Sequence, residues 1–471
     1  MRPYISLLLC CILPACTVGP NYQVPNNLMP AHYAAKTPNH PLPKTEQLWW
    51  NSFSDPILVH LINQALSGSN YDIQKAYATI RQARAELNIV QADYYPQLNA
   101  KGQYERNKIS ENAEIISAFP PGLIPLTYSD YQFAFDASWE LDVFGGIRRG
   151  VQSSSAQYQS AIENQNNVTL ITAAEVAKTY TQYRVYQKRI AIAKHTIASY
   201  TETVRLVTLQ KKAGTITDVD LHRSESEVLA AKAALPPLEA EAQASLAALA
   251  VLIGELPESL FLQLNKKAPI PAINAKNLDL GLPSDLLLRR PDIKIAERNL
   301  AAATADIGVA TANLFPRFQL IGNFGADTTN PGNFFQSASR LWSIAPQISI
   351  PIFQGGRLKN AVKDKVAQSD GALASYKQTI LQALADVESS MIRYEKERVR
   401  KESLLASFNT LYAAKKLVQL QYKAGQVSLT DVLDVERQLD QLSDQYTQSQ
   451  GLMTINLISV YKALGGGWVK L

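Results

Sequence analysis

The sequence predicts a mixed, mainly α-helical protein made of two tandem copies of one unit: a helix, a β-hairpin, a very long helix and its returning partner. Residues 72–98 align with 292–318 without a gap, which indicates an internal duplication. The segment LQKKAGTITDVD (209–220) recurs as LQYKAGQVSLTD (420–431), so the same helical turn is built twice. Between the helices the hydrophobic period changes to two, which is typical of strands.

The chain begins with an export signal, MRPYISLLLCCILPAC. Its apolar run of about 10 residues is shorter than the roughly 20 needed to cross a bilayer. LPAC (13–16) resembles the lipobox of bacterial lipoproteins, which implies cleavage before Cys16 and lipid attachment there. A plain secretory signal that happens to contain a cysteine is the alternative. All three cysteines lie in this segment, so the mature chain has none left for disulfides or metal thiolates.

The repeat divides the chain into six parts. They are a signal peptide (1–15), a lipidated extended segment (16–51), a first copy (52–265), a Pro-containing linker (266–283), a second copy (284–467) and a short tail (468–471). No run after Cys16 approaches 18 consecutive apolar residues. We therefore expect that any membrane crossing by the mature chain is made by strands.

Each copy contains an unusually long helix. There is no Pro or Gly from Val151 to Ala213, and only Gly371 interrupts the run from Arg357 to Ala424. At 1.5 Å per residue each helix would reach roughly 90–100 Å. Helices of this length with thin apolar stripes are not stable alone, so we expect them to pack side by side.

Each long helix is predicted to return through an Ala-Gly turn. Gly214 and Gly425 suit the left-handed position after a helix. The next helices begin with Thr217 followed by Asp220, and Ser428 followed by Asp431, two capping-box patterns. LPPLE (235–239) is expected to interrupt the first returning helix, and the second copy has no such break.

Four strands are predicted, at about 97–107, 129–143, 317–326 and 341–352. In YQFAFDASWELDVF (131–144) the aromatic and aliphatic residues alternate with polar ones. A half-buried soluble sheet would give the same alternation, but strands of about ten residues with one apolar face also fit a membrane barrel. Four strands cannot close a barrel, and an open edge in lipid leaves backbone groups unpaired. If these strands span a membrane, several chains must pool them.

Several motifs resemble the TolC-like family of outer-membrane factors of Gram-negative efflux systems, in its NodT-type lipoprotein subgroup. They are TVGPNY (17–22), LWWNSFSDPILVHLINQAL (48–66), LLLRRPDIKIAERNLAAATADIGVATANLFP (286–316) and IFQGGR (352–357). The resemblance implies a homotrimer whose twelve strands form one transmembrane β-barrel in the outer membrane. A long periplasmic α-helical barrel would continue it. The resemblance also implies a periplasmic adaptor protein and an inner-membrane pump of the RND type as partners.

In that family the helical turns close the tube, and acidic residues in a pattern like DVLD line the constriction. Here the pattern is Asp431 to Asp434, and both share a helix face with Arg437. Threefold symmetry would gather the carboxylates into a ring. Ordinary capping and surface charges are the alternative, which stays open for Asp431 because Asp220 occupies the same place in the first copy. The counterparts of Asp434 and Arg437 are Arg223 and Ser226, so capping does not require this pair, and these two are the predicted gate residues.

Motifs for catalysis are absent from the sequence: there is no phosphate loop, GxSxG or HExxH, and the five histidines are scattered. Neither an enzyme nor a cofactor is expected. The net charge of +5 without a Lys/Arg cluster gives no support for a nucleic-acid partner. The resemblance implies a passive exit duct for drugs or other small molecules, gated at the periplasmic helix tips. A coiled-coil envelope lipoprotein or adaptor that tethers membranes is the alternative.

Overall fold

The computed structural model describes residues 17–26, 30, 33, 48–117, 120, 123, 125–214, 216–272 and 285–467. The predicted signal peptide, the lipid-attachment residue Cys16 and the tail 468–471 lie outside the described residues. The helices are α1 (Pro56–Gln64), α2 (Tyr71–Ala92), α3 (Glu114–Ser117), α4 (Gly146–Lys212), α5 (Asp218–Ile253), α6 (Pro257–Leu264), α7 (Leu286–Arg289), α8 (Pro291–Ala312), α9 (Arg357–Lys423) and α10 (Leu429–Ala463). The strands are β1 (Gln97–Lys108), β2 (Thr127–Leu141), β3 (Arg317–Thr328) and β4 (Arg340–Ser349).

The tandem duplication and the mainly helical class are confirmed. Both long helices, α4 and α9, have 67 residues. The observed strands differ from the predicted ones by three residues or fewer at each end. The chain folds into two compact units, and each takes segments from both copies. Unit 1 comprises residues 1–25, 81–160 and 296–375, and unit 2 comprises the remainder.

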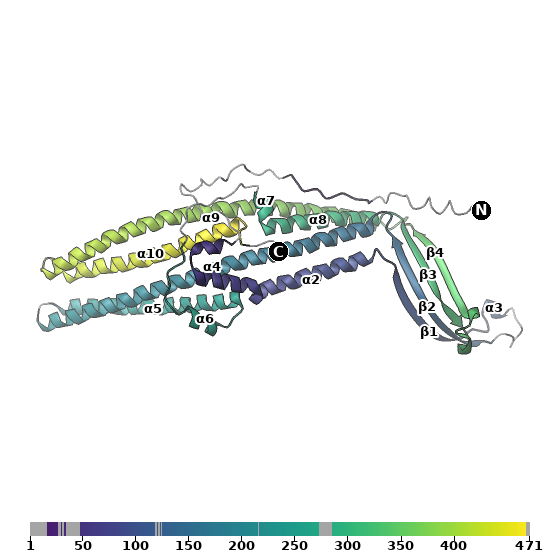
Figure 1. Ribbon diagram of the computed structural model, residues 1–471, viewed down its shortest axis with the longest axis horizontal. Helices are drawn as coiled ribbons and strands as arrows, with labels where there is room; N and C mark the ends of the chain where they lie inside the picture. The colour runs from purple at the N-terminus through teal and green to yellow at the C-terminus, as the bar shows by residue number, and fades with distance from the viewer. Residues whose placement is uncertain are drawn as a thin grey trace. The chain divides into compact units, whose positions relative to one another are not determined.

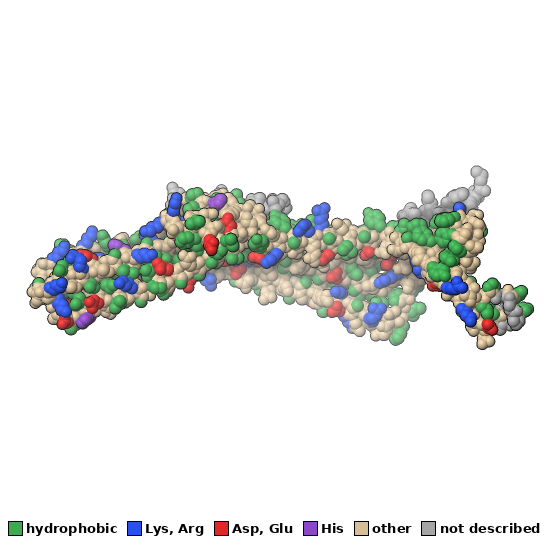
Figure 2. Space-filling model, turned by 90° about the horizontal axis from the view of Figure 1, so that it is seen from below, with side chains coloured by type: hydrophobic (Ala, Val, Ile, Leu, Met, Phe, Trp, Pro, Cys, Tyr) green, Lys and Arg blue, Asp and Glu red, His purple; other side chains and the backbone are tan. Residues whose placement is uncertain are grey.

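Unit 1 contains one antiparallel sheet in the order β1-β2-β3-β4 (Figure 1). Consecutive strands pair, so β1 and β4 form its two edges. Large apolar side chains on the sheet stay exposed in the single chain, among them Phe324 at 59%, Trp342 at 72% and Ile344 at 70%. Figure 2 shows hydrophobic side chains gathered on the sheet, whereas charged side chains are scattered along the helices.

The first strand-to-helix corner of unit 1 holds the segment that follows the predicted lipid-attachment residue. Arg149, only 3% exposed, donates from Nε to Val18 O at 3.0 Å and from Nη2 to Gly19 O and Asn21 Oδ1. Thr17 lies against Gly145, where an added Cβ would be 2.8 Å from its Cγ2. Burial lowers the pKa of Arg149, and the positive charge of Arg148 adds to the effect. The segment is therefore held by backbone and amide oxygens around one guanidinium.

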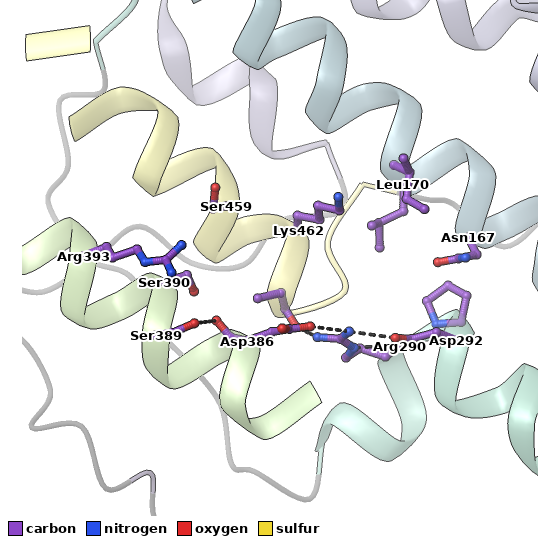
Figure 3. Close-up of a pocket in the computed structure, with 13 residues that line it drawn as sticks. Asn167, Leu170, Arg290, Asp292, Asp386, Ser389, Ser390, Arg393, Ser459 and Lys462 are labelled. Atoms are coloured by element: carbon purple, nitrogen blue, oxygen red, sulfur yellow. Dashed lines mark hydrogen bonds and ion pairs between the residues drawn. The ribbon is translucent and has the colours of Figure 1, made fainter. Parts of the chain in front are cut away.

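Unit 2 contains α5, α10 and the C-terminal parts of α4 and α9, arranged as two antiparallel helix pairs (Figure 1). Where α8 begins, the buried Arg290 joins three segments: it donates to Asp292 at 2.7 Å, to Asp386 on α9 at 3.2 Å and to Ala463 O at 3.0 Å (Figure 3). Within the described residues no single helix has both the length and the apolar composition to cross a membrane. The pair α5 and α6 meets both criteria only when taken together, and it bends by 113°.

The predicted interruption at LPPLE is wrong. Helix α5 continues through Pro236 and Pro237 to Ile253. Two prolines remove the hydrogen bonds to the carbonyls of Lys232 and Ala233, but all four residues are exposed, so water can satisfy those carbonyls. The cost of the prolines is thereby reduced, and packing of the buried face of α5 keeps the helix intact.

Candidate gate at the two hairpin turns

The two Ala-Gly turns have the predicted backbone. Gly214 and Gly425 take φ of +76° and +73°, which a side chain would strain. After α9, Gly425 N–H donates to Tyr422 O at 3.0 Å and Gln426 N–H to Gln421 O at 2.9 Å, a Schellman-type ending. Each long helix is thus stopped and reversed by its own local hydrogen bonds.

Both returning helices begin with a complete capping box. Thr217 and Ser428 accept from the N–H of Asp220 and Asp431, and each carboxylate accepts from the N–H of its cap residue. The Thr217 and Ser428 hydroxyls also donate to these carboxylates and lower the pKa of both. The structure gives Asp431 the same capping role as Asp220, and both side chains remain at the surface.

Asp434 and Arg437 lie one turn further along α10. Arg437 Nη2 is 3.0 Å from Asp434 Oδ1, and both side chains are half-exposed. Neither group is required by the cap or by the core of the hairpin. The pair is a half-exposed i,i+3 ion pair on the surface of α10, next to the turn.

Contacts between the two hairpins are the part of this site that sequence reasoning missed. Tyr422 Oη on α9 donates to Gln210 Oε1 on α4 at 3.0 Å. Arg223 Nη1 on α5 donates to Thr430 Oγ1 on α10 at 3.0 Å. These two hydrogen bonds, which we call the latch, join the tip of the first hairpin to the tip of the second.

An apolar cluster lies beneath the latch. Val207 from α4 packs with Leu429 and Leu433 from α10, and all three are at most 9% exposed. Ile216, Leu221 and Tyr422 cover this cluster. Spacing four residues apart puts Leu429 and Leu433 on one helix face, a signal that identifies a contact face but not its partner.

Deeper in unit 2 an ion pair joins the hairpins again. Arg189 on α4 holds Asp444 on α10 in a two-pronged contact, with Nε–Oδ1 at 2.6 Å and Nη2–Oδ2 at 3.0 Å. The buried Glu436 is held by Lys415 at 3.1 Å and by Gln419 at 3.0 Å, both from α9. The bidentate contact of Arg189 with Asp444 fixes the geometry more firmly than a single ion pair does.

A half-buried carboxyl, Asp440, follows on the same face of α10. Burial raises its pKa, and the negative charge of Glu436 adds to the effect. Hydrogen bonds from the hydroxyls of Tyr200 and Thr196 oppose it. Burial and the neighbouring carboxyl groups raise the pKa of Tyr200 as well. Burial therefore disfavours the charged form of both groups.

Chemically this arrangement joins the two hairpins by non-covalent contacts alone. Its bonds are a few hydrogen bonds, one bidentate ion pair and a small apolar cluster. In the part of the chain that the structure describes, no group of three or more His, Cys, Asp or Glu could hold a metal ion. The site consists of contacts that can break and re-form.

Known proteins share this architecture. The family profile described as Outer membrane efflux protein matches residues 61–255 and again 282–466. The chain belongs to the outer membrane efflux protein family.

The relatives of this outer membrane efflux protein match it over nearly its full length. The solvent efflux pump outer membrane protein SrpC of Pseudomonas putida is 30% identical over 480 residues, covering 99% of this chain and 98% of its own. Nodulation protein T of Rhizobium leguminosarum bv. trifolii is 30% identical over 439 residues, covering 93% and 90%. The solved outer-membrane channel OprN matches with a TM-score of 0.88 at 34% identity, covering 96% and 100%.

Proposed function

We propose that this chain is the outer-membrane exit duct of a tripartite efflux system. It is a passive, water-filled channel that releases drugs or other small molecules and extends into the periplasm. An inner-membrane pump of the RND type supplies the energy, and a periplasmic adaptor links pump to duct. The chain itself catalyses no reaction in this proposal. The similarity to the solvent efflux protein SrpC over almost the whole chain supports it.

The observation that carries the proposal is a four-stranded sheet with an exposed apolar face and two free edges. Lipid favours apolar side chains but not unpaired backbone groups, so the edges must be covered when the sheet is in a membrane. Three copies would supply twelve strands, which is enough to close a barrel. A coiled-coil tether, the alternative, would need no such sheet.

The anchor and the gate complete the proposal. Acyl chains on Cys16 would fasten each subunit to the outer membrane. At the hairpin turns, the latch keeps the two hairpins together. Asp434 and Arg437 face the narrowed opening, together with Asp431, which also belongs to the capping box. A ring of carboxylates there would favour cations over anions.

Purified protein in a planar bilayer tests the duct. We expect a trimer in native mass spectrometry and cation-selective conductance steps that are small while the gate is closed. A monomer that gives no conductance would rule the duct out.

The variant Asp434→Asn tests the gate because it removes charge with little change in shape. We expect a severalfold loss of cation preference and more frequent openings. Its matched control is Thr430→Ser, which keeps the hydroxyl that Arg223 contacts and leaves the charges unchanged. Equal ion selectivity in Asp434→Asn and the unmodified protein would contradict the gate assignment.

A further inference from the structure

A cavity of about 490 Å³ lies beside the first strand-to-helix corner of unit 1. The beginning of α4, one face of α8 and the N-terminal residues Asn21 and Tyr22 form most of its wall. Arg148, Arg149 and Arg298 line it, and none of its described lining residues is acidic. A cavity whose lining charges are all positive attracts anions.

Arg149 carries a buried positive charge in the wall of this cavity. Its guanidinium lies next to Arg148, which is itself balanced by Asp142, with Nε 3.2 Å from Oδ2. The hydrogen bonds that Arg149 donates to the described residues go to neutral oxygens: Val18 O, Gly19 O, Asn21 Oδ1 and Gln152 Oε1. A buried charge without an opposite charge is costly. The corner therefore keeps one positive charge that an anion in the cavity would balance.

The Arg149 end of the cavity lies at the level of the membrane surface when the sheet is in a membrane. Cys16, which is predicted to carry lipid, is two residues before Val18, and Val18 O accepts from Arg149. Trp139 on the apolar face of β2 donates from Nε1 to Tyr94 O at 3.0 Å, and Trp and Tyr are enriched at membrane interfaces. Arg149 is three residues into α4, about 4.5 Å along its axis. That distance is within the headgroup layer, which is roughly 5–8 Å thick.

We propose that the Arg149 end of the cavity binds the phosphate of an anionic phospholipid from the periplasmic leaflet. Arg148, whose side chain is 30% exposed, contacts the phosphate directly, and the buried Arg149 acts through its charge. The acyl chains then lie against the apolar face of the sheet, beside those on Cys16. This inference rests on the proposed membrane location of the sheet, and it adds a non-covalent lipid to the predicted covalent one.

The far end of the same cavity provides a matched control. There Arg298 Nη1 donates to Gln159 Oε1 at 2.9 Å, and Glu297 balances the charge of Arg298. Gln159 is ten residues after Arg149, about 15 Å further along α4. This end therefore has no excess charge and lies below the headgroup layer.

The variant Asn21→Asp tests the site because it supplies the missing negative charge from the protein itself. Its carboxylate takes the place of the amide oxygen that accepts from Arg149 Nη2 at 2.9 Å. We expect the corner to be at least as stable in thermal unfolding, and the affinity for the lipid phosphate to fall. Gln159→Glu makes the same change beside Arg298 and should leave lipid binding unchanged.

Native mass spectrometry of trimers incubated with phosphatidylglycerol in detergent counts the lipids that each trimer retains. We expect one phosphatidylglycerol per chain in the unmodified protein and in Gln159→Glu, and severalfold fewer in Asn21→Asp. Equal retention in Asn21→Asp and the unmodified protein would overturn the site. Equal losses in both variants would overturn it as well, because they would show an effect of overall charge.

Two further measurements separate the remaining outcomes. Glycerophosphate, which has the phosphate but no acyl chains, should not displace the lipid, and displacement at similar concentration would mean that the cavity takes a soluble anion instead. If Asn21→Asp does not fold, Arg148→Gln must lose the lipid, since the N–H of residue 148 can still donate to Asp142. Unchanged retention in Arg148→Gln would overturn the site. A monomer in native mass spectrometry would overturn the duct, whereas a trimer that retains no phosphatidylglycerol would overturn the lipid site alone.

Discussion

The two hairpin turns have the same backbone and different side chains. Both follow a 67-residue helix, both turn at a glycine with φ near +75°, and both continue into a capping box. At equivalent positions the first turn has Lys211 and Arg223, whereas the second has Tyr422 and Asp434. Lys211 pairs with Asp218 inside its own hairpin, but Tyr422 reaches across to Gln210 on the other one.

This difference separates the residues that build the turns from those that we propose control opening. Features present in both copies stop and reverse a helix, and either copy needs them. Features present in one copy join the two hairpins or add charge beside the turn. Equivalent positions in the two copies are therefore matched pairs for experiment: a structural role predicts equal effects, and a role in opening predicts unequal ones.

The largest difference between equivalent positions of the two copies is expected in stability, at the strand-to-helix corners. Arg149→Met removes a buried guanidinium that holds Val18, Gly19 and Asn21, and should lower the free energy of unfolding of unit 1 by about 2–4 kcal/mol. Its counterpart Asn360 is exposed in the second corner, so Asn360→Met should change stability by no more than about 0.5 kcal/mol. Thermal unfolding measures both. Equal shifts would mean that the N-terminal segment does not stabilise this corner.

Local features of the fold could be predicted from the sequence. A helix without Pro or Gly, a glycine at a C-terminus and a capping box are decided by neighbouring residues, so the long helices and both turns were found. The break expected at Pro236 and Pro237 was wrong, because tertiary packing and exposure of the freed carbonyls outweigh the local cost of proline.

Contacts between distant segments could not be predicted. Arg189 and Asp444 are 255 residues apart, and each lies on a helix with many surface charges of similar spacing. The same holds for Tyr422 and Gln210. Periodicity identifies the face of a helix but not the residue that faces it, so the latch required the structure.

The next largest difference between equivalent positions is expected in channel opening, at the latch. Tyr422→Phe removes the hydroxyl that Gln210 accepts, a loss of about 1 kcal/mol, and should raise the open fraction about fivefold in single-channel records. Lys211→Met at the equivalent position breaks only an ion pair within one hairpin and should leave opening unchanged. Similar opening rates in the two variants would remove Tyr422 from the latch.

A smaller effect is expected from pH at Asp440. Folding raises the pKa of this carboxyl, so the folded state keeps its proton at pH values where the unfolded chain has lost it, and lowering the pH favours folding. Asp440→Asn should raise the melting temperature of the helical unit at pH 7, and the gain should shrink as the pH approaches about 4. Asp444→Asn, which breaks the pair with Arg189, should instead lower the melting temperature. A gain for Asp440→Asn that is independent of pH would contradict the burial of its charge.

The smallest difference between the two copies is expected at the capping boxes, where the effects on stability should be equal. The hydroxyls of Thr217 and Ser428 lower the pKa of Asp220 and Asp431, so both carboxylates stabilise the turns at neutral pH and lose that effect as the pH falls through their lowered values. An amide oxygen can accept the hydrogen bond from the cap residue's N–H, as Gln does in capping boxes, so Asp220→Asn and Asp431→Asn should give equal, small decreases in melting temperature. Cation selectivity in planar bilayers then separates the two roles. A change in Asp431→Asn alone places that carboxylate in the conduction path, whereas no change in either variant leaves Asp431 as a helix cap only.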